Sequence, residues 1–228
     1  MSPSHPAARG LFVVLEGGEG VGKTTQWQRI GAALLANGHE VVALREPGGT
    51  AAGDVLRGVL LDPSSELTGE SEALLFAASR AQLVQSVIRP ALERGAIVLV
   101  DRFLLSTYAY QGAGRGLSIP ALRAINHFAT GGLAPDMTLL LTMPLESALA
   151  RMQARGTIDR LEREDVAFHR RVQTAFAEAA SVAWQQRHPE VGPVYSIEAE
   201  GSPDLVTARC VEQLAACCPT RFAGVVHD

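Results

Sequence analysis

The chain has 228 residues, of which 47% are hydrophobic and 19% are charged, and its formal net charge is −4. This composition is typical of a globular protein and excludes a disordered chain, and the length fits one α/β domain over residues 1–228. The negative charge argues against general nucleic-acid binding. No apolar run reaches the roughly 20 residues that cross a bilayer, so we expect no membrane partner.

The predicted elements alternate between strands and helices along the chain. Residues 1–9 lack an apolar core, so we expect a disordered terminus rather than a secretory signal. Short apolar runs bounded by turn residues predict buried parallel strands at 11–16, 40–45, 96–101, 136–142 and 193–197. Helical patterns occupy residues 22–36, 52–61, 69–94, 118–130, 145–155, 160–186 and 203–216. This order predicts an α/β fold in which a five-stranded parallel sheet carries helices on both faces.

The first predicted strand leads into a glycine-rich loop. The sequence Gly17-Gly-Glu-Gly-Val-Gly-Lys-Thr24 matches the pattern G-x-x-x-x-G-K-[ST], whose backbone N–H groups surround phosphate oxygens. Lys23, which is the only lysine of the chain, would bridge the β and γ phosphates, and the Thr24 hydroxyl would hold Mg²⁺. We therefore expect ATP to bind at Gly17, Gly18, Glu19, Gly20, Val21, Gly22, Lys23, Thr24 and Thr25.

The third predicted strand ends in a carboxylate, Asp101. A strand end that aims a carboxylate at the phosphate loop suits a second Mg²⁺ ligand, although aspartates also cap strands without binding metal. The phosphate loop by itself indicates only that a nucleoside triphosphate binds. A small GTPase is disfavoured because no Asn-Lys-x-Asp sequence occurs, and a partition ATPase because glycine occupies position 18, where that class has a lysine.

Arginines and an aromatic residue follow the other predicted strands. The sequence Arg45-Glu-Pro-Gly-Gly-Thr50 follows the second strand, and Arg102 directly follows the third. Phe76 and Arg80 share one helical face, which suits base stacking and edge recognition, although Phe76 equally fits a core position. The arginines around Gly156, at positions 151, 155, 160 and 163, indicate a lid over residues 151–163 that closes on ATP.

Together these segments resemble bacterial thymidylate kinases. The matching sequences are LEGGEGVGKTT (15–25), REPGGT (45–50), LFAASR (75–80), DRF (101–103), STYAYQG (106–112) and RGTIDR (155–160). They occur in the family's order, and nothing beyond Arg170 contributes. The resemblance implies a P-loop nucleoside-monophosphate kinase fold, Mg²⁺-dependent transfer of the γ-phosphoryl group of ATP to dTMP in dTTP biosynthesis, and a homodimer formed by helix packing.

The resemblance also implies roles for residues that would bind the thymine base. Phe76 would stack on the ring, while Arg80 and Gln111 would read its edge. Thr107 would lie near N3, at a position where some family members have asparagine.

The remaining implied roles concern the sugar and the phosphates. Arg102 and Arg57 would hold the acceptor phosphate, and Glu46 would lie near the phosphates and the metal. Tyr110 would crowd the 2′ position of the sugar, and Glu19 would approach its 3′ hydroxyl.

One form of the family carries a catalytic arginine in the phosphate loop, at the position of Gly20 here. The resemblance therefore assigns that charge to Arg155 or Arg160, and the expected catalytic residues are Lys23, Arg102, Arg155, Arg160 and Glu19. Two alternatives stay open: a kinase for another nucleotide such as dUMP or guanylate, and a P-loop switch that acts on a protein partner. The odd number of cysteines, which are Cys210, Cys217 and Cys218, predicts a reducing compartment, the cytoplasm.

Overall fold

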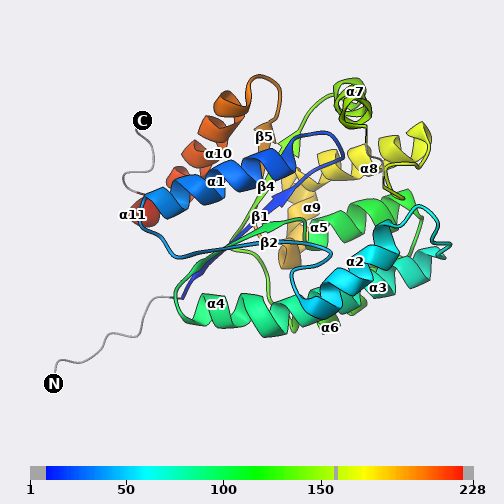
Figure 1. The fold of residues 1–228 in the computed structure, drawn as a ribbon, viewed down its shortest axis with the longest axis horizontal. Helices are drawn as coiled ribbons and strands as arrows, with labels where there is room; N and C mark the ends of the chain where they lie inside the picture. Colours follow the sequence, from blue (N-terminus) through cyan, green and yellow to red (C-terminus); the bar gives the residue numbers. More distant parts are fainter. Residues whose placement is uncertain (1–8, 157–158, 223–228) are drawn as a thin grey trace.

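A five-stranded parallel sheet forms the centre of the computed structural model, which describes residues 9–156 and 159–222. The strands lie in the order β2-β3-β1-β4-β5 (Figure 1). Their bounds are β1 (Leu11–Glu16), β2 (Val41–Arg45), β3 (Ile97–Asp101), β4 (Met137–Thr142) and β5 (Val194–Glu198). Each agrees with the predicted strand to within one residue at either end. The expected α/β architecture, a five-stranded parallel sheet with helices on both faces, is confirmed.

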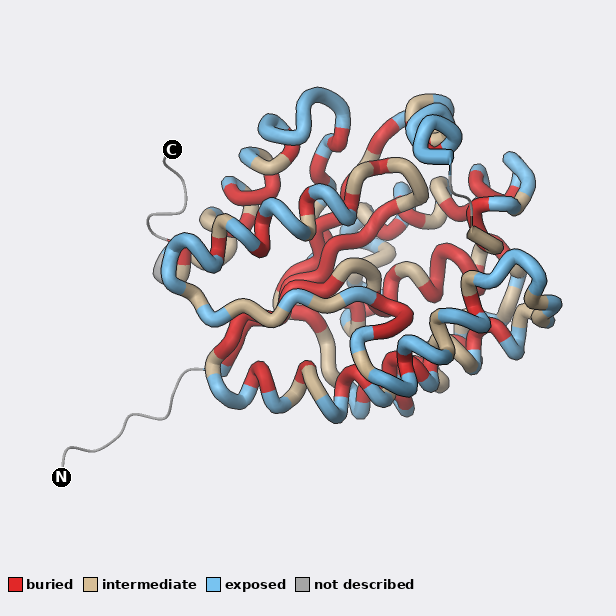
Figure 2. The backbone as a smooth tube through the Cα atoms, viewed as in Figure 1, coloured by how far each residue is buried: buried red, intermediate tan, exposed pale blue. Residues whose placement is uncertain are grey.

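Helices cover both faces of the sheet, which is why its central strands are apolar throughout. One face packs against α1 (Lys23–Ala36) and α10 (Pro203–Cys217), with α11 (Pro219–Phe222) beside them. The opposite face packs against α3 (Gly69–Leu83), α4 (Arg89–Glu93), α6 (Ile119–Thr130), α8 (Val166–Ala179) and α9 (Val182–Arg187). Figure 2 shows the buried strands between the inward faces of these helices.

The side chains of β1 alternate between the two cores, as the period of a strand requires. Phe12 and Val14 belong to the core under α3 and α8, whereas Val13 and Leu15 belong to the core under α1 and α10. Because the strands are parallel, the loops that follow β1, β2, β3 and β4 meet at one edge of the sheet. α2 (Ala51–Leu61) and α7 (Leu145–Arg155) begin at this edge.

The long helix predicted over residues 160–186 is wrong. Residues 160–163 form turns, and α8 and α9 are separate helices. The break has a local cause, because Asp165 accepts a hydrogen bond from the Phe168 N–H and Ser181 accepts one from the Trp184 N–H. Each side chain satisfies a free N–H at the start of a new helix, a capping signal that the helical periodicity hides.

Two π-helical segments were also missed. Residues Val84–Ile88 form the segment η1, which joins α3 to α4 within the predicted helix 69–94. Residues Tyr108–Gly114 form η2, which continues α5 (Leu104–Thr107) after β3. π-turns are frequent at functional sites, and η2 carries Tyr110 and Gln111.

The expected disordered terminus covers residues 1–9, of which 1–8 lie outside the described residues. Arg9 itself is ordered, since its Nη1 donates to Asp136 Oδ1 at 2.7 Å and its carbonyl accepts from Arg221 Nη2. No helix in the described ranges combines the length and the hydropathy needed to cross a membrane.

Candidate active site

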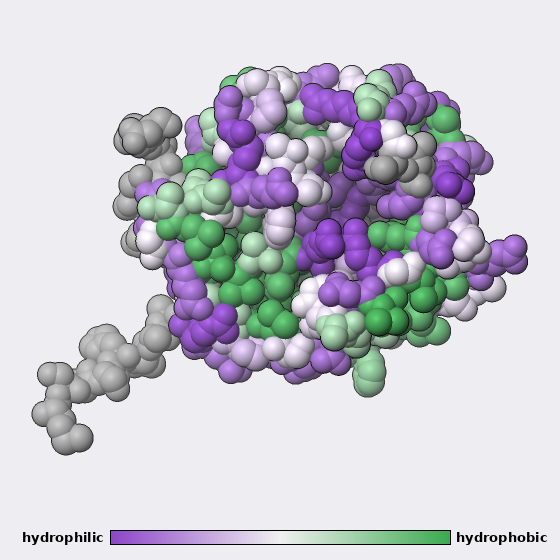
Figure 3. Space-filling model, viewed as in Figure 1, coloured by the Kyte–Doolittle hydropathy of each residue, from purple (hydrophilic) through white to green (hydrophobic). Residues whose placement is uncertain are grey.

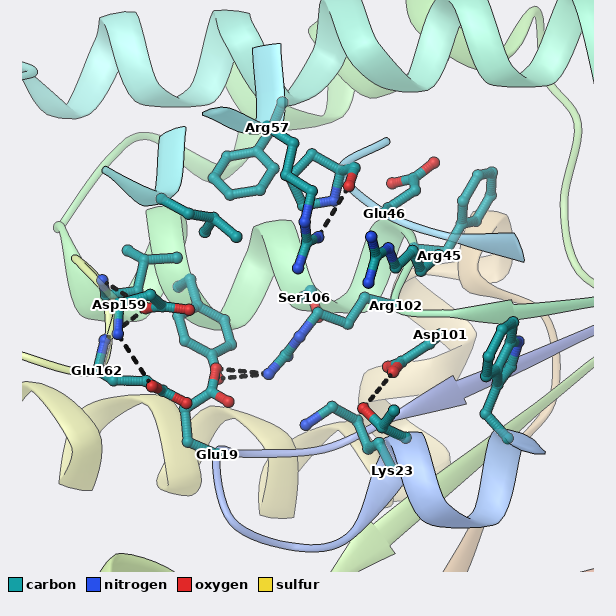
Figure 4. Close-up of a pocket in the computed structure, with 18 of the residues that line it drawn as sticks. Glu19, Lys23, Arg45, Glu46, Arg57, Asp101, Arg102, Ser106, Asp159 and Glu162 are labelled. Carbon is teal, nitrogen blue, oxygen red and sulfur yellow. Dashed lines mark hydrogen bonds and ion pairs between the residues drawn. The ribbon is translucent and has the colours of Figure 1, made fainter. Parts of the chain in front are cut away.

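A cavity of about 1060 Å³ opens at the carboxyl edge of the sheet. Figure 3 shows hydrophilic side chains around the hollow, and Figure 4 shows residues that line it. Most of the predicted site residues line this cavity: Glu19, Gly20, Gly22, Lys23, Thr24, Thr25, Glu46, Arg57, Phe76, Arg80, Asp101, Arg102, Thr107, Tyr110, Gln111 and Arg155. The tertiary structure thus gathers residues from five parts of the chain. Gly17, Gly18, Val21 and Arg160 are not part of the lining.

The phosphate loop joins β1 to α1 through three glycines with positive φ: Gly17 at 142°, Gly20 at 74° and Gly22 at 92°. Only glycine adopts such angles at little cost. A Cβ atom at Gly20 would lie 2.0 Å from the carbonyl oxygen of Ala148, which is in α7. A side chain such as arginine therefore does not fit at this position unless α7 shifts.

Lys23 begins α1 and is buried, with only 6% of its surface exposed. Its Nζ donates to the Gly18 carbonyl oxygen at 2.6 Å, so the side chain folds back over the loop. Burial and the nearby charge of Arg102 lower the pKa of Lys23 to about 8. A compact ammonium held in this way suits an anionic ligand that would restore its charge.

Thr24 and Asp101 come together across the ends of α1 and β3. The Thr24 hydroxyl donates to Asp101 Oδ2 at 3.1 Å, and Asp101 Oδ1 is buried without a hydrogen-bond partner among the described residues. A hydroxyl and a carboxylate with an unused buried oxygen are suitable Mg²⁺ ligands, because Mg²⁺ is usually bound by a few protein oxygens together with substrate phosphates. The pair therefore fits the metal role predicted for both residues.

Arg102 lies at the centre of the cavity in an unusual backbone conformation. It is the only described residue other than glycine with a positive φ, which is 72°. Its Nη1 donates to the carbonyl oxygen of Gly17 and to the Ser106 hydroxyl, both at 3.1 Å. A strained backbone conformation persists only where the surrounding structure fixes it. Here this conformation places the Arg102 guanidinium between the phosphate loop and α5.

Glu19 binds this guanidinium from the phosphate loop. Its Oε1 lies 2.5 Å from Arg102 Nη2 and accepts a hydrogen bond from the Tyr110 hydroxyl at 2.8 Å. Burial alone would raise the pKa of Glu19, but the charges of Arg102 and Lys23 lower it to about 2. The Arg102 guanidinium also lies 5.0 Å above the Tyr110 ring, so Tyr110 is fixed beside the phosphate loop.

Glu16, the last residue of β1, was missed as a functional residue. It is fully buried, and its Oε1 accepts from the backbone N–H groups of Phe103 and Ser106 at 2.8 and 3.0 Å. Its Oε2 accepts a hydrogen bond from the Ser106 hydroxyl, and the oxygen of the same hydroxyl accepts one from Arg102 Nη1. Asp101 was predicted because it is an acidic residue at the end of an apolar strand. Glu16 has the same position in β1 and could have been predicted in the same way.

Glu46 and Arg80 form a buried ion pair at 2.8 Å. Burial raises the pKa of Glu46 to about 7, against the opposing charge of Arg80. All three guanidinium nitrogens of Arg80 donate to protein acceptors, which are Glu46, Thr107, Asn126 and the Phe103 carbonyl oxygen. Arg80 therefore orients Thr107 in this conformation, and its predicted contact with a base edge stays a prediction.

Phe76 and Arg57 complete the side of the cavity opposite the phosphate loop. Phe76 is half-buried, since it lines the cavity and also packs against the core, so both of its predicted roles are compatible with its position. Arg57 Nη1 donates to the Pro47 carbonyl oxygen at 2.9 Å, which directs the guanidinium toward Arg102 (Figure 4). Burial and the neighbouring Arg45 lower the pKa of Arg57 below its usual value.

The two predicted lid arginines have different surroundings. Arg155 lines the cavity, its side chain is 51% exposed, and it pairs with Glu162. Arg160 instead binds Glu72 Oε2 at 2.6 Å and the Leu60 carbonyl oxygen at 2.8 Å. Arg155 thus lies at the cavity, where its predicted role toward the phosphates stays a prediction, whereas Arg160 is held at the end of α2. Residues 157 and 158 of the predicted lid lie outside the described residues.

Comparison with known proteins identifies the family to which the chain is similar. The family model described as thymidylate kinase matches residues 15–188. The chain is 54% identical over 173 residues to a thymidylate kinase of Deinococcus radiodurans, which covers 76% of this chain and 84% of the relative. It is 48% identical over 216 residues to one of Synechococcus sp., which covers 94% of this chain and 98% of the relative.

Proposed function

Because the chain belongs to the thymidylate kinase family, we propose that it transfers the γ-phosphoryl group of ATP to dTMP, giving dTDP and ADP for dTTP and DNA synthesis. One observation carries the proposal. Arg102 lies between the phosphate loop and the half of the cavity that contains Phe76 and Gln111. It contacts the loop by hydrogen bonds to Gly17 and Glu19. A guanidinium in that position can hold the phosphate of an acceptor facing ATP.

The phosphate loop would hold ATP. Its backbone N–H groups and Lys23 suit the β and γ phosphates, and Thr24 and Asp101 suit Mg²⁺. When bound, the ion neutralises charge on the β and γ phosphates. Arg155 would add positive charge from α7, since Gly20 leaves no room for an arginine in the loop.

The other half of the cavity would hold dTMP. Phe76 offers an aromatic face for thymine, and Arg57 and Arg102 offer guanidinium groups for the acceptor phosphate. Tyr110 and Glu19 would face the sugar. The nucleophile is a phosphate oxygen of dTMP, which is already anionic, so the protein supplies position and charge rather than a covalent intermediate.

The proposal extends to the assembly and location of the chain. Four exposed apolar side chains lie on α2, α3 and α6, helices that pack side by side: Val55, Val59, Leu74 and Phe128. Figure 3 shows hydrophobic side chains gathered below and to the right of the hollow, over this region. We propose that this face forms a homodimer, and that the enzyme acts in the cytoplasm, where its three free thiols stay reduced.

A panel of nucleoside monophosphates tests the function. ADP release should depend on an acceptor and should be fastest with dTMP, compared with dUMP, dCMP, dGMP and GMP. Preference for dUMP or a guanylate would replace the substrate assignment. ATP hydrolysis without acceptor dependence would favour the P-loop switch instead. Removal of Mg²⁺ with a chelator should abolish turnover, and added Mg²⁺ should restore it.

A further inference from the structure

Glu72 is a buried carboxylate that the predicted mechanism does not use. It lies in α3 with 0% of its surface exposed. Two guanidinium groups contact it, since Arg115 Nη2 lies 2.9 Å and Arg160 Nη2 lies 2.6 Å from Oε2. Burial would raise the pKa of Glu72, but hydrogen bonds from Arg115, Gln111 and Arg160 hold it below its usual value. Glu72 is therefore an anion in the native protein.

The third contact of Glu72 is with a residue of the cavity wall. Its Oε1 accepts a hydrogen bond from Gln111 Nε2 at 2.9 Å. An ionised carboxylate is only an acceptor, so the amide of Gln111 must turn its NH₂ group toward Glu72. The amide oxygen then points away from Glu72. In the part of the chain that the structure describes, no donor contacts this oxygen.

Among the neighbours of Gln111, the Thr107 hydroxyl already accepts one hydrogen bond. The guanidinium of Arg80 donates to four protein acceptors, and one of them is the Thr107 hydroxyl oxygen. The amide oxygen of Gln111 is therefore an acceptor that is still available at this wall of the cavity.

We propose that Glu72 is a positioning residue, which fixes the Gln111 amide with its oxygen toward the base and so selects a base with an N–H donor at that edge. The inference rests on the proposed function. Thymine and uracil carry a hydrogen on N3, whereas cytosine carries a lone pair there. A fixed carbonyl oxygen would bind the first two and repel the third. An amide free to rotate could present its NH₂ group and accept cytosine.

The test compares Glu72→Gln with the wild-type enzyme, using the KM for dTMP and the inhibition constants of dCMP and dUMP as competitors of dTMP. A neutral amide at position 72 can pair with either end of Gln111. We expect the ratio of the dCMP inhibition constant to the dTMP KM to fall about tenfold, the worth of one hydrogen bond. The dUMP ratio should stay constant, because uracil shares N3–H with thymine.

Arg115→Met is the matched control. It removes one ion pair from the same carboxylate but leaves Gln111 and Arg160 in place, so it should lower the melting temperature and keep the dCMP ratio. The inference is overturned if folded Glu72→Gln keeps the wild-type dCMP ratio, or if all three constants rise in parallel.

Two further variants decide the matter should Glu72→Gln not fold. Glu72→Asp keeps the negative charge but shortens the side chain by one methylene, which moves the carboxylate away from Gln111. Gln111→Met removes the amide group and keeps a similar side-chain volume. Both should lower the dCMP ratio, and an unchanged ratio in either would refute the inference. If wild-type enzyme does not phosphorylate dTMP at all, the proposed function fails instead, whatever the variants show.

Discussion

Arg102 shows how several simultaneous contacts fix the position of one charge. Its side chain reaches Gly17, Glu19, Ser106 and Tyr110 at once, although the backbone adopts an unfavourable φ. The contacts are made by both terminal nitrogens, Nη1 and Nη2, of the planar guanidinium group. A single ammonium cannot reproduce that geometry, even with the same charge.

Arg102→Lys should therefore lower kcat/KM for dTMP by about 100-fold, while the dissociation constant of ATP changes by less than about threefold. A coupled ADP assay and calorimetric titration with ATP measure the two quantities. Near-normal turnover of the variant would show that the acceptor phosphate does not depend on this guanidinium.

Lys23 gives the site a pH dependence whose sign follows from its burial. With a pKa of about 8 in the free protein, it is about half charged at pH 8, and phosphates would raise that pKa. ATP binding at pH 8 should therefore take up about half a proton and weaken as the pH rises above 8.

Calorimetry in two buffers of different ionisation enthalpy measures this uptake. Lys23→Arg is the control, because its guanidinium does not titrate in this range and binding should release or take up almost no proton there. Buffer-independent heats for the wild type would contradict the prediction.

At the scale of elements, α5 depends on a partner far away in the sequence. α5 has no cap of its own, and Glu16 at the end of β1 accepts two of its first N–H groups instead. The same carboxylate holds Ser106, which contacts Arg102. The strand thus fixes both the start of the helix and the side chain of Arg102.

Glu16→Gln should lower the unfolding free energy by about 1–3 kcal/mol and raise the KM for dTMP, since the buried N–H groups lose a charged acceptor. Urea denaturation and steady-state kinetics measure the effects. Ser202→Ala removes the N-cap of α10 and should cost about 1 kcal/mol without changing that KM. Equal kinetic effects in both variants would mean that Glu16 acts through stability alone.

At the scale of the whole molecule, α2, α3 and α6 present apolar side chains to solvent. Phe128 in α6 is 88% exposed and Val55 in α2 is 69% exposed, which is costly for a monomer. The cavity also lies against α2 and α3, through Arg57 and Phe76. Pairing of this face would therefore stabilise the helices that carry Arg57 and Phe76.

Phe128→Glu should convert the proposed dimer to a monomer, because a carboxylate would be buried without a partner at the interface. Sedimentation equilibrium measures the mass. Leu35→Glu changes an equally apolar but separate exposed position in α1, 57% exposed, and should leave the dimer intact. A wild-type chain that sediments as a monomer would refute this assembly.

Local patterns determined much of this protein. The apolar runs located every strand to within one residue, and the glycine spacing located the phosphate loop, because both depend on neighbours in the chain. The resemblance to thymidylate kinases, carried by short segments, is confirmed for the family. The periodicity failed over 160–186, where capping by Asp165 and Ser181 divides the helix.

Other features were decided only by the tertiary structure. Glu16 and Glu72 act through residues 87 and 39 positions away, in the contacts with Phe103 and Gln111. The positive φ of Arg102 and the separation of Arg160 from the cavity likewise follow from packing between distant segments. A buried carboxylate takes its role from the donors that folding brings to it, and one-dimensional spacing does not identify those donors.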